Sequence, residues 1–156
     1  MKKLYLFALV LALNNNAFSS DTTIIRIHDH TDMTWYGNYD TVGVLPDGTF
    51  DYRKIYLHYT MGCATNGCSD WDYTTQIFLR HKTGELDTAL NEIIENYELA
   101  RVITPYGGTL ANNWEFTSIF DITDFAPLLK DSVEIRCHYS GWSSGFSATL
   151  DFEFIK

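Results

Sequence analysis

Basic residues are scarce in this chain of 156 residues, which has 11 Lys and Arg against 20 Asp and Glu and a formal net charge of −9 at pH 7. Proteins that bind nucleic acids neutralise backbone phosphates with clustered Lys and Arg. The sequence has no such cluster, so we expect no nucleic-acid partner.

Long hydrophobic runs are also missing, apart from one at the amino terminus. Lys2 and Lys3 precede an apolar run over residues 4–13, which is too short to span a bilayer of about 30 Å as a helix. Ala17 and Ser19 are small residues at a spacing that suits signal peptidase. We therefore predict a signal peptide over the first 20 residues, a secreted, periplasmic or cell-surface protein, and no membrane partner.

Repeats, low-complexity tracts and linkers are absent from the rest of the sequence. Loss of the two leader lysines would take the net charge from −9 to −11. The remaining length suits one compact domain with one core. We predict a single domain over residues 21–156.

Signatures of common nucleophilic enzymes are missing as well. No Gly-x-Ser-x-Gly elbow occurs, and the segment Gly141-Trp-Ser-Ser-Gly145 lacks the strand-turn-helix setting of one. The histidines have no recognisable acid and nucleophile partners, and no Gly-rich loop could cradle a phosphate. The sequence gives no support for a serine, cysteine or lysine nucleophile.

Apolar residues that alternate with polar ones are abundant, which is typical of half-buried strands. The alternation is clearest in residues 55–61, 133–139 and 150–154, and further strands are predicted at residues 23–28, 50–53, 73–80, 98–103 and 114–120. Turn signals such as Pro46-Asp47-Gly48 and Gly107-Gly108 separate these segments. Seven or eight short strands without alternating long helices predict an all-β sandwich of two antiparallel sheets, jelly-roll or immunoglobulin-like.

Two segments depart from this alternation. In residues 86–97 the apolar residues follow a helix-like spacing after Asp87, a possible N-cap, which predicts a short helix between strands. In residues 123–130, Thr123 or Asp124 could cap one helical turn that has Pro127 in its first turn. We expect this turn to bridge the two sheets.

The three cysteines divide into a close pair and a single residue. In an oxidising compartment Cys63 and Cys68 can close a small disulfide ring. A zinc site would need a second thiol pair, which is missing, so we predict the disulfide. Cys137 stands in an alternating apolar pattern and is predicted to be a buried free thiol rather than an intermolecular bridge.

The ring leads directly into Asp70, Trp71 and Asp72, which form the candidate site. A fixed carboxylate beside an aromatic face suits a sugar, and the chain has ten Tyr, ten Phe and four Trp. High aromatic content also fits β-propensity. The alternative is that the ring only staples a loop, with Trp71 in the core and the aspartates solvated.

Residues 55–156 carry three motifs that resemble the amino-terminal jelly-roll domain of the peptide-N-glycosidase F family. The motifs are Cys63-x4-Cys68-x2-Trp71-Asp72, then Tyr97-Glu-Leu-Ala-Arg-Val-Ile-Thr-Pro-Tyr106, then Phe120-Asp-Ile-Thr-Asp-Phe125 leading into Leu128-Leu129. The ending Ala148-Thr-Leu-Asp-Phe-Glu-Phe154 is similar to that domain's last strand. The resemblance implies a jelly-roll sandwich, and residues 21–54 add little to it.

The resemblance also implies a reaction. The family cleaves the amide that joins an Asn side chain to the first N-acetylglucosamine of a glycan, without metal or cofactor, so the expected partner is an N-glycosylated protein or peptide. The family's principal aspartate corresponds to Asp72, and Trp71 and Trp142 match tryptophans near the sugar. Asp70 is a further candidate for substrate binding. Core packing is the alternative for both tryptophans.

Three departures from the family weigh against a complete active site. Tyr73 stands where the family has an arginine, and Ser140 stands where it has a second acid. The family also builds its cleft between two jelly rolls, and the second is absent from this sequence. Three hypotheses therefore stay open: an amidase domain completed by a second jelly roll, a glycan-binding module, and a structural module.

A metal site is the remaining alternative, because the architecture also resembles the copper-dependent peptide-hydroxylating monooxygenases. The chain has five histidines, His28, His30, His58, His81 and His138. His28 and His30 could share one face of a strand, yet no second His-x-His or methionine ligand set follows. We therefore expect no metal.

Overall fold

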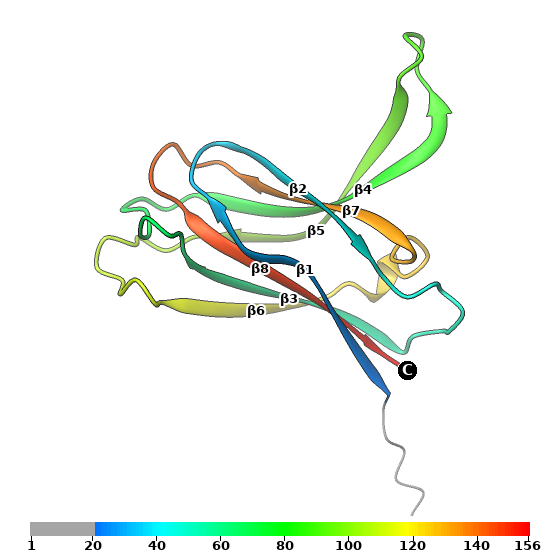
Figure 1. The fold of residues 1–156 in the computed structure, drawn as a ribbon, viewed down its shortest axis with the longest axis horizontal. Coiled ribbons are helices and arrows are strands. Elements are labelled where there is room, and N and C mark those ends of the chain that lie inside the picture. The colour runs from blue at the N-terminus through cyan, green and yellow to red at the C-terminus, as the bar shows by residue number, and fades with distance from the viewer. Residues whose placement is uncertain (1–20) are drawn as a thin grey trace, which may run out of the picture.

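The computed structural model describes residues 21–156, which form two four-stranded antiparallel sheets packed face to face (Figure 1). The all-β fold class is confirmed. The predicted signal peptide lies outside the described residues. Residues 21–156 contain no helix long and apolar enough to cross a membrane.

Eight strands and one 3-10 turn make up the domain. They are β1 (Thr22–Met33), β2 (Gly37–Val44), β3 (Lys54–Cys63), β4 (Thr74–Leu86), β5 (Glu92–Ile103), β6 (Glu115–Asp121), η1 (Thr123–Phe125), β7 (Ser132–Tyr139) and β8 (Phe146–Ile155).

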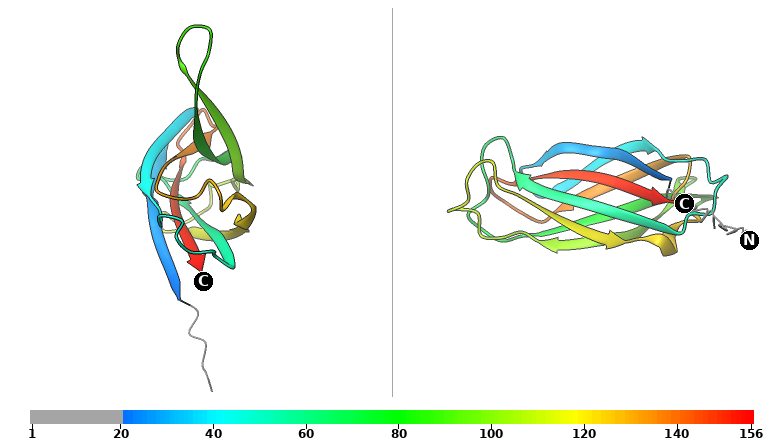
Figure 2. Two further views of the ribbon diagram at one scale, coloured as in Figure 1. Left: turned by 90° about the vertical axis from the view of Figure 1, so that its right-hand side faces the viewer. Right: turned by 90° about the horizontal axis from the view of Figure 1, so that it is seen from below.

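The strand order shows a jelly roll. One sheet has the order β1-β8-β3-β6 and the other β2-β7-β4-β5, so the chain crosses between the sheets in most of its connections. Because neighbouring strands are antiparallel, four connections meet at one end of the sandwich: residues 34–36, 64–73, 104–114 and 140–145. We call this end the loop end. It lies opposite the carboxyl terminus (Figures 1 and 2).

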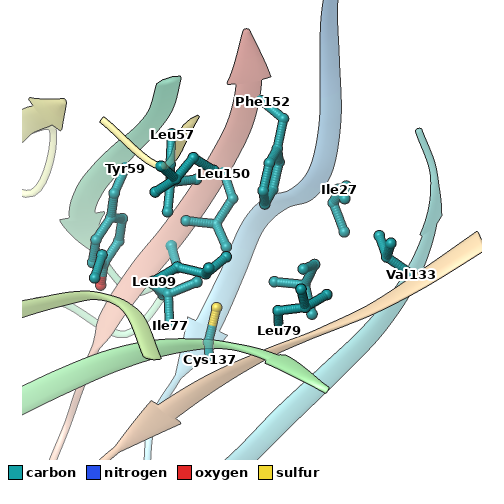
Figure 3. Packing of buried hydrophobic residues seen from close by; sticks show 14 of the residues in the cluster. Ile27, Leu57, Tyr59, Ile77, Leu79, Leu99, Val133, Cys137, Leu150 and Phe152 are labelled. Carbon is teal, nitrogen blue, oxygen red and sulfur yellow. The ribbon is translucent and has the colours of Figure 1, made fainter. Parts of the chain in front are cut away.

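The core fills the space between the sheets (Figure 3). Alternation places Ile55, Leu57 and Tyr59 of β3 on the inner face, and every second residue of β7 and β8 is buried in the same way. Burying apolar surface of this kind contributes about 25 cal/mol per Å². Cys137 lies in this core as a free thiol with no exposed surface, as predicted, and burial raises the pKa of its thiol.

Two predicted elements are wrong, and one strand was not predicted. Residues 86–97 form no helix: β4 continues to Leu86, a turn follows, and β5 starts at Glu92. The helix-like spacing does not reflect a helix. This hairpin packs against no core, so its apolar residues need not alternate with polar ones as they do in a half-buried strand. Residues 50–53 form a connection rather than a strand, and β2 was not anticipated, since Gly37 and Gly43 weaken its β pattern.

The helical turn expected after residue 122 is present but is capped differently. η1 covers Thr123–Phe125 and connects β6 of one sheet to β7 of the other. Its N-cap is Ile122, with no side-chain cap. The Thr123 hydroxyl instead accepts a hydrogen bond from the amide of Ile55 at 3.1 Å, which joins the turn to β3.

The predicted disulfide joins Cys63 at the end of β3 to Cys68. Inside the ring, the amide of Gly67 donates to the carbonyl of Ala64 at 2.8 Å, with Gly67 at a φ of +97°, which favours glycine. The amide of Thr65 donates to the carboxylate of Asp32 on β1. The ring is therefore a closed turn that is hydrogen-bonded to β1.

Replacement of Cys68 by serine should lower the free energy of unfolding by about 2 kcal/mol, the loop-entropy value for so short a ring. Denaturant unfolding under oxidising conditions measures the change. Cys63→Ser is the comparison, because it opens the same ring from the other cysteine and should lower the stability by the same amount. Equal stability of wild type and Cys68→Ser would show that the ring contributes nothing to stability.

One buried polar side chain couples the fold to pH. His28 on β1 is 1% exposed, and its ring nitrogens lie 3.0 Å from the Thr31 hydroxyl and 3.1 Å from the Ile135 carbonyl. Burial lowers the pKa of His28 because the charged imidazolium loses its hydration. At pH values below the ordinary histidine pKa, His28 therefore binds fewer protons in the folded protein than in the unfolded chain.

We expect the free energy of unfolding to be highest above about pH 6.5 and to fall as the pH drops below that value, where the unfolded chain protonates first. Burial also lowers the pKa of His138, which adds in the same direction. Denaturant midpoints measured between neutral and mildly acidic pH give the slope. His28→Asn should flatten it, and an unchanged slope in that variant would contradict this origin.

Candidate functional site

A buried serine hydroxyl organises the loop end. Ser69 is 1% exposed, and its hydroxyl lies 2.7 Å from that of Ser143 in the β7–β8 connection. The same oxygen accepts a hydrogen bond from the amide of Trp71 at 3.1 Å. The backbone carbonyl of Ser69 accepts a hydrogen bond from the amide of Gly107, in the β5–β6 connection, at 2.7 Å. Ser69 thus joins three connections directly beside the Asp70–Asp72 segment.

The glycine pair of the β5–β6 connection is a site of close approach. A Cβ on Gly107 would lie 2.3 Å from the Ser69 carbonyl oxygen, and one on Gly108 would lie 2.6 Å from Oδ1 of Asp70. At Gly107 only glycine allows the two backbones to pack at this distance, whereas the exposed side chain of Asp70 could move away from a Cβ at residue 108. The pair predicted as a turn signal therefore holds one loop against the candidate acids.

Asp72 is exposed at this packed surface. The next residue is anchored on both sides, because the amide of Tyr73 donates to the Thr104 hydroxyl at 2.8 Å and the Thr104 amide donates to the Tyr73 carbonyl at 2.8 Å. The exposed Tyr106 faces Asp72: hydrogen bonding to this carboxylate raises the pKa of the phenol. The phenol therefore stays protonated beside Asp72.

Tyr106 was not among the residues selected from the sequence. It ends the second of the three family-like motifs, so its position in that motif was the available signal. Its contact with Asp72 arises because the Gly107 turn brings the β5–β6 connection onto the Ser69 segment.

No Lys or Arg in residues 21–156 forms an ion pair with Asp70 or Asp72, both of which are exposed. Tyr73, at the family's arginine position, does not provide an alternative partner. Its hydroxyl lies 3.1 Å from the Ser143 hydroxyl, and its ring packs edge-on against Tyr139 with centroids 5.4 Å apart. Tyr73 therefore joins the network beneath the surface.

Ser140, at the position of the family's second acid, also has a structural role. Its hydroxyl accepts a hydrogen bond from the amide of Thr74 at 2.9 Å, and its own amide donates to the Thr74 carbonyl at 3.1 Å. The side chain thus completes the first pairing of β4 with β7 and presents no carboxylate at the surface.

Exposed aromatic rings form a ledge at the loop end. Trp35, Tyr36 and Trp142 are 54%, 51% and 60% exposed, and we call them the aromatic ledge. Tyr36 stacks on Trp142 with centroids 5.1 Å apart and planes 12° apart, while Trp35 meets Trp142 edge-on at 5.5 Å. His138 supports Tyr36 edge-on at 5.4 Å.

The ledge and Asp72 both lie at the loop end, where the hydroxyl of Ser143, next to Trp142 in the chain, joins the network of Ser69 and Tyr73. Trp71 is also exposed, at 62%. Core packing, the alternative for Trp71 and Trp142, is therefore wrong for both. Trp35 and Tyr36 were missed by sequence reasoning, since they lie in residues 21–54, which carry no family-like motif.

The histidines do not form a cluster. His28 is buried whereas the side chain of His30 is 65% exposed, because a bulge with His30 at a φ of +45° turns the two apart. The expectation that they could share one face is wrong. In the described part of the chain, no group of three or more His, Cys, Asp or Glu side chains could hold a metal ion.

Comparisons with known proteins point to one kind of enzyme, although no family model matches the chain. The sequence is 28% identical, over 157 aligned positions, to peptide-N(4)-(N-acetyl-beta-D-glucosaminyl)asparagine amidase F of Elizabethkingia miricola. The alignment covers 93% of this chain and 40% of that protein.

Solved structures agree. A recombinant peptide:N-glycanase F matches with a TM-score of 0.65 and 25% identity, over 86% of this chain and 41% of the other. PNGase F, a glycosylasparaginase from Flavobacterium meningosepticum, matches with the same TM-score and 23% identity, over 86% of this chain and 42% of the other. PNGF-II shares the fold, with a TM-score of 0.63 and 13% identity, over 85% of this chain and 34% of the other.

The chain spans about 40% of the length of the relatives that it matches. The resemblance seen in the three sequence motifs is therefore confirmed, and the matched length is consistent with one jelly-roll domain of a peptide-N-glycosidase F-like protein.

Proposed function

We propose that this chain is the amino-terminal domain of a secreted peptide-N-glycosidase F-like amidase, and that it supplies Asp72 as the acid acting at the Asn–N-acetylglucosamine amide. The observation that carries this proposal is the position of Asp72, exposed on a loop held by Ser69 and the Cys63–Cys68 ring and facing the phenol of Tyr106. A second jelly-roll domain would complete the cleft.

The chemistry requires a positioned carboxyl group. Hydrolysis of the Asn side-chain amide gives an aspartate and a glycosylamine, so a group must move protons between water and the leaving nitrogen. A carboxylate fixed on a rigid loop serves that purpose better than one on a mobile loop.

The completing domain would change the behaviour of Asp72. At an open surface a carboxylate is well hydrated and is a weak base. Covering it with a second domain would remove water and raise its basicity. We therefore expect the chain alone to bind glycan more readily than it cleaves it.

Substrate binding is assigned to the aromatic ledge together with Trp71 and Asp70. Exposed aromatic faces pack against the apolar face of a pyranose ring, and a carboxylate accepts hydrogen bonds from sugar hydroxyls. The proposed ligand is the inner part of an N-glycan still attached to its peptide.

Glycan binding without cleavage is the second candidate function. Tyr73 and Ser140 carry no charge, and both side chains are committed to hydrogen bonds within the loop end. An amidase that used those two positions for an arginine and an acid would lose a charge partner and half of a carboxylate pair here. The ledge would remain intact in this case.

In the presence of a second jelly-roll domain, Asp72→Asn should abolish release of glycan from an N-glycosylated peptide while leaving the melting temperature within about 1 °C, because the side chain lies exposed at the surface. Asp70→Asn is the matched control and should affect binding rather than release. Mass spectrometry follows release, and calorimetry follows binding. Release that is equal in wild type and Asp72→Asn would overturn the catalytic assignment.

The same experiment separates the two candidate functions. Release by wild type, lost in Asp72→Asn, supports the amidase. Binding without release, in the isolated chain and after addition of a second jelly-roll domain, supports the glycan-binding module. Neither binding nor release would leave a structural module as the best account.

Trp142→Ala should weaken binding of an N-glycosylated peptide about tenfold, or about 1.4 kcal/mol, because it removes the central ring of the ledge. Tyr36→Ala should weaken it by less, since Tyr36 mainly supports Trp142. Phe50→Ala is the control, because Phe50 is 55% exposed at the opposite end of the sandwich. Equal affinities across the three variants would exclude the ledge as the glycan site.

A further inference from the structure

The hairpin between β4 and β5 extends beyond the sandwich as a two-stranded arm over residues 83–96, which we call the β-arm (Figures 1 and 2). None of its residues is buried. An isolated two-stranded hairpin is only marginally stable in water, and its exposed edges invite pairing. Neither the core nor the candidate site explains the β-arm.

The tip of the β-arm exposes apolar side chains. Leu86, Leu90 and Ile93 are 59%, 78% and 38% exposed. Around them the β-arm has four acids and no base: Glu85, Asp87, Glu92 and Glu95. Its surface is therefore apolar and negatively charged.

Leu90 is unsuited to the turn that it occupies. Its φ is +66°, in the left-handed region that favours Gly and Asn. The turn itself is stabilised by Asp87, whose Oδ1 accepts hydrogen bonds from the amides of Ala89 at 2.8 Å and Asn91 at 2.9 Å. A leucine therefore adds strain and exposed apolar surface where glycine would serve the turn better. Contact with another surface accounts for it.

A cleft of about 530 Å³ lies at the base of the β-arm. Apolar side chains, including Leu79, Leu128 and Val133, line it together with Lys82 and Lys130. Lys130 forms no ion pair with any residue from 21 to 156, although the chain is strongly acidic.

The acids of the cleft leave this positive charge available. Glu134 is paired with Arg80, and Arg80 also contacts Asp40 at 3.2 Å, so neither acid faces the cleft unneutralised. Asp131 is the one further acid in the lining. The exposed ion pair of Lys82 with Glu92, at 3.2 Å, contributes little and can exchange partners.

We infer that two copies of this chain form a dimer by exchanging β-arms, with the tip of each β-arm in the cleft of the other copy. Apolar and acidic residues of the tip match the apolar floor and lysines of the cleft. The cleft lies at the base of the same β-arm that carries the tip. A two-fold axis at the middle of the paired β-arms therefore places each tip at the base of the partner's β-arm, where the partner's cleft lies.

The two-fold symmetry halves the contact area that each β-arm must supply. A stable interface buries about 1,200 Å² or more in total. A two-fold arrangement uses the same contact twice, so each β-arm and cleft need supply only about half of that area. This interface lies away from the loop end and leaves the candidate site open.

The test is the oligomeric state of the purified chain, measured by sedimentation equilibrium over a wide range of concentration. Wild type should associate to a dimer, and Leu90→Asn should be monomeric with an equal or higher melting temperature, because asparagine relieves the left-handed strain. Ile24→Asn, at an exposed apolar position on β1, should remain dimeric.

The charge of the cleft provides an independent test. Lys130→Glu should weaken the dimer at least tenfold, and added salt should weaken wild type in the same direction. Arg53→Glu, at the other exposed basic residue without an ion pair in residues 21–156, is the matched control and should have no effect. A wild type that stays monomeric, or a dimer that survives both Leu90→Asn and Lys130→Glu, would overturn the inference.

Discussion

The hydroxyl and carbonyl of Ser69 are the contacts on which the loop end depends. They hold together the connections that follow β3, β5 and β7, which come from both sheets. A buried hydroxyl is costly unless its hydrogen bonds are made, so these loops are stable only in an arrangement that satisfies it. Together with the disulfide, which closes the preceding turn, this constraint gives Asp72 a defined position on the surface.

The same network explains why the departures from the amidase pattern leave the fold intact. At residues 73 and 140, where the resemblance implies an arginine and a second acid, Tyr73 and Ser140 form neutral hydrogen bonds to Ser143 and to Thr74 at the start of β4. The loop end therefore closes without charged side chains at these two positions. Trp35, Tyr36 and Trp142 expose aromatic rings at this surface. Such rings suit contact with the flat apolar face of a ligand.

Prediction from the sequence succeeded where the polarity of each residue matches its own burial. Alternation located the inner faces of β3, β7 and β8, because each strand lies on a core that accepts apolar residues from one side only. It failed for residues 86–97, where no core stands behind the hairpin and the apolar residues follow no strand period. The 50–53 segment spans only four residues, which is too short to establish a period, and β2 was missed because Gly37 and Gly43 have no side chains that could show one.

The sequence by itself determined the sandwich, the cysteine pairing, the buried thiol of Cys137 and the resemblance that points to Asp72, because these follow from local pattern, spacing and motif. The tertiary structure decided which residues gather around that acid. Tyr106, Trp35 and Tyr36 reach the loop end from connections far apart in the chain. Their meeting depends on strand order and on close approaches such as that of Gly107 to Ser69, which are properties of packing rather than of any one segment.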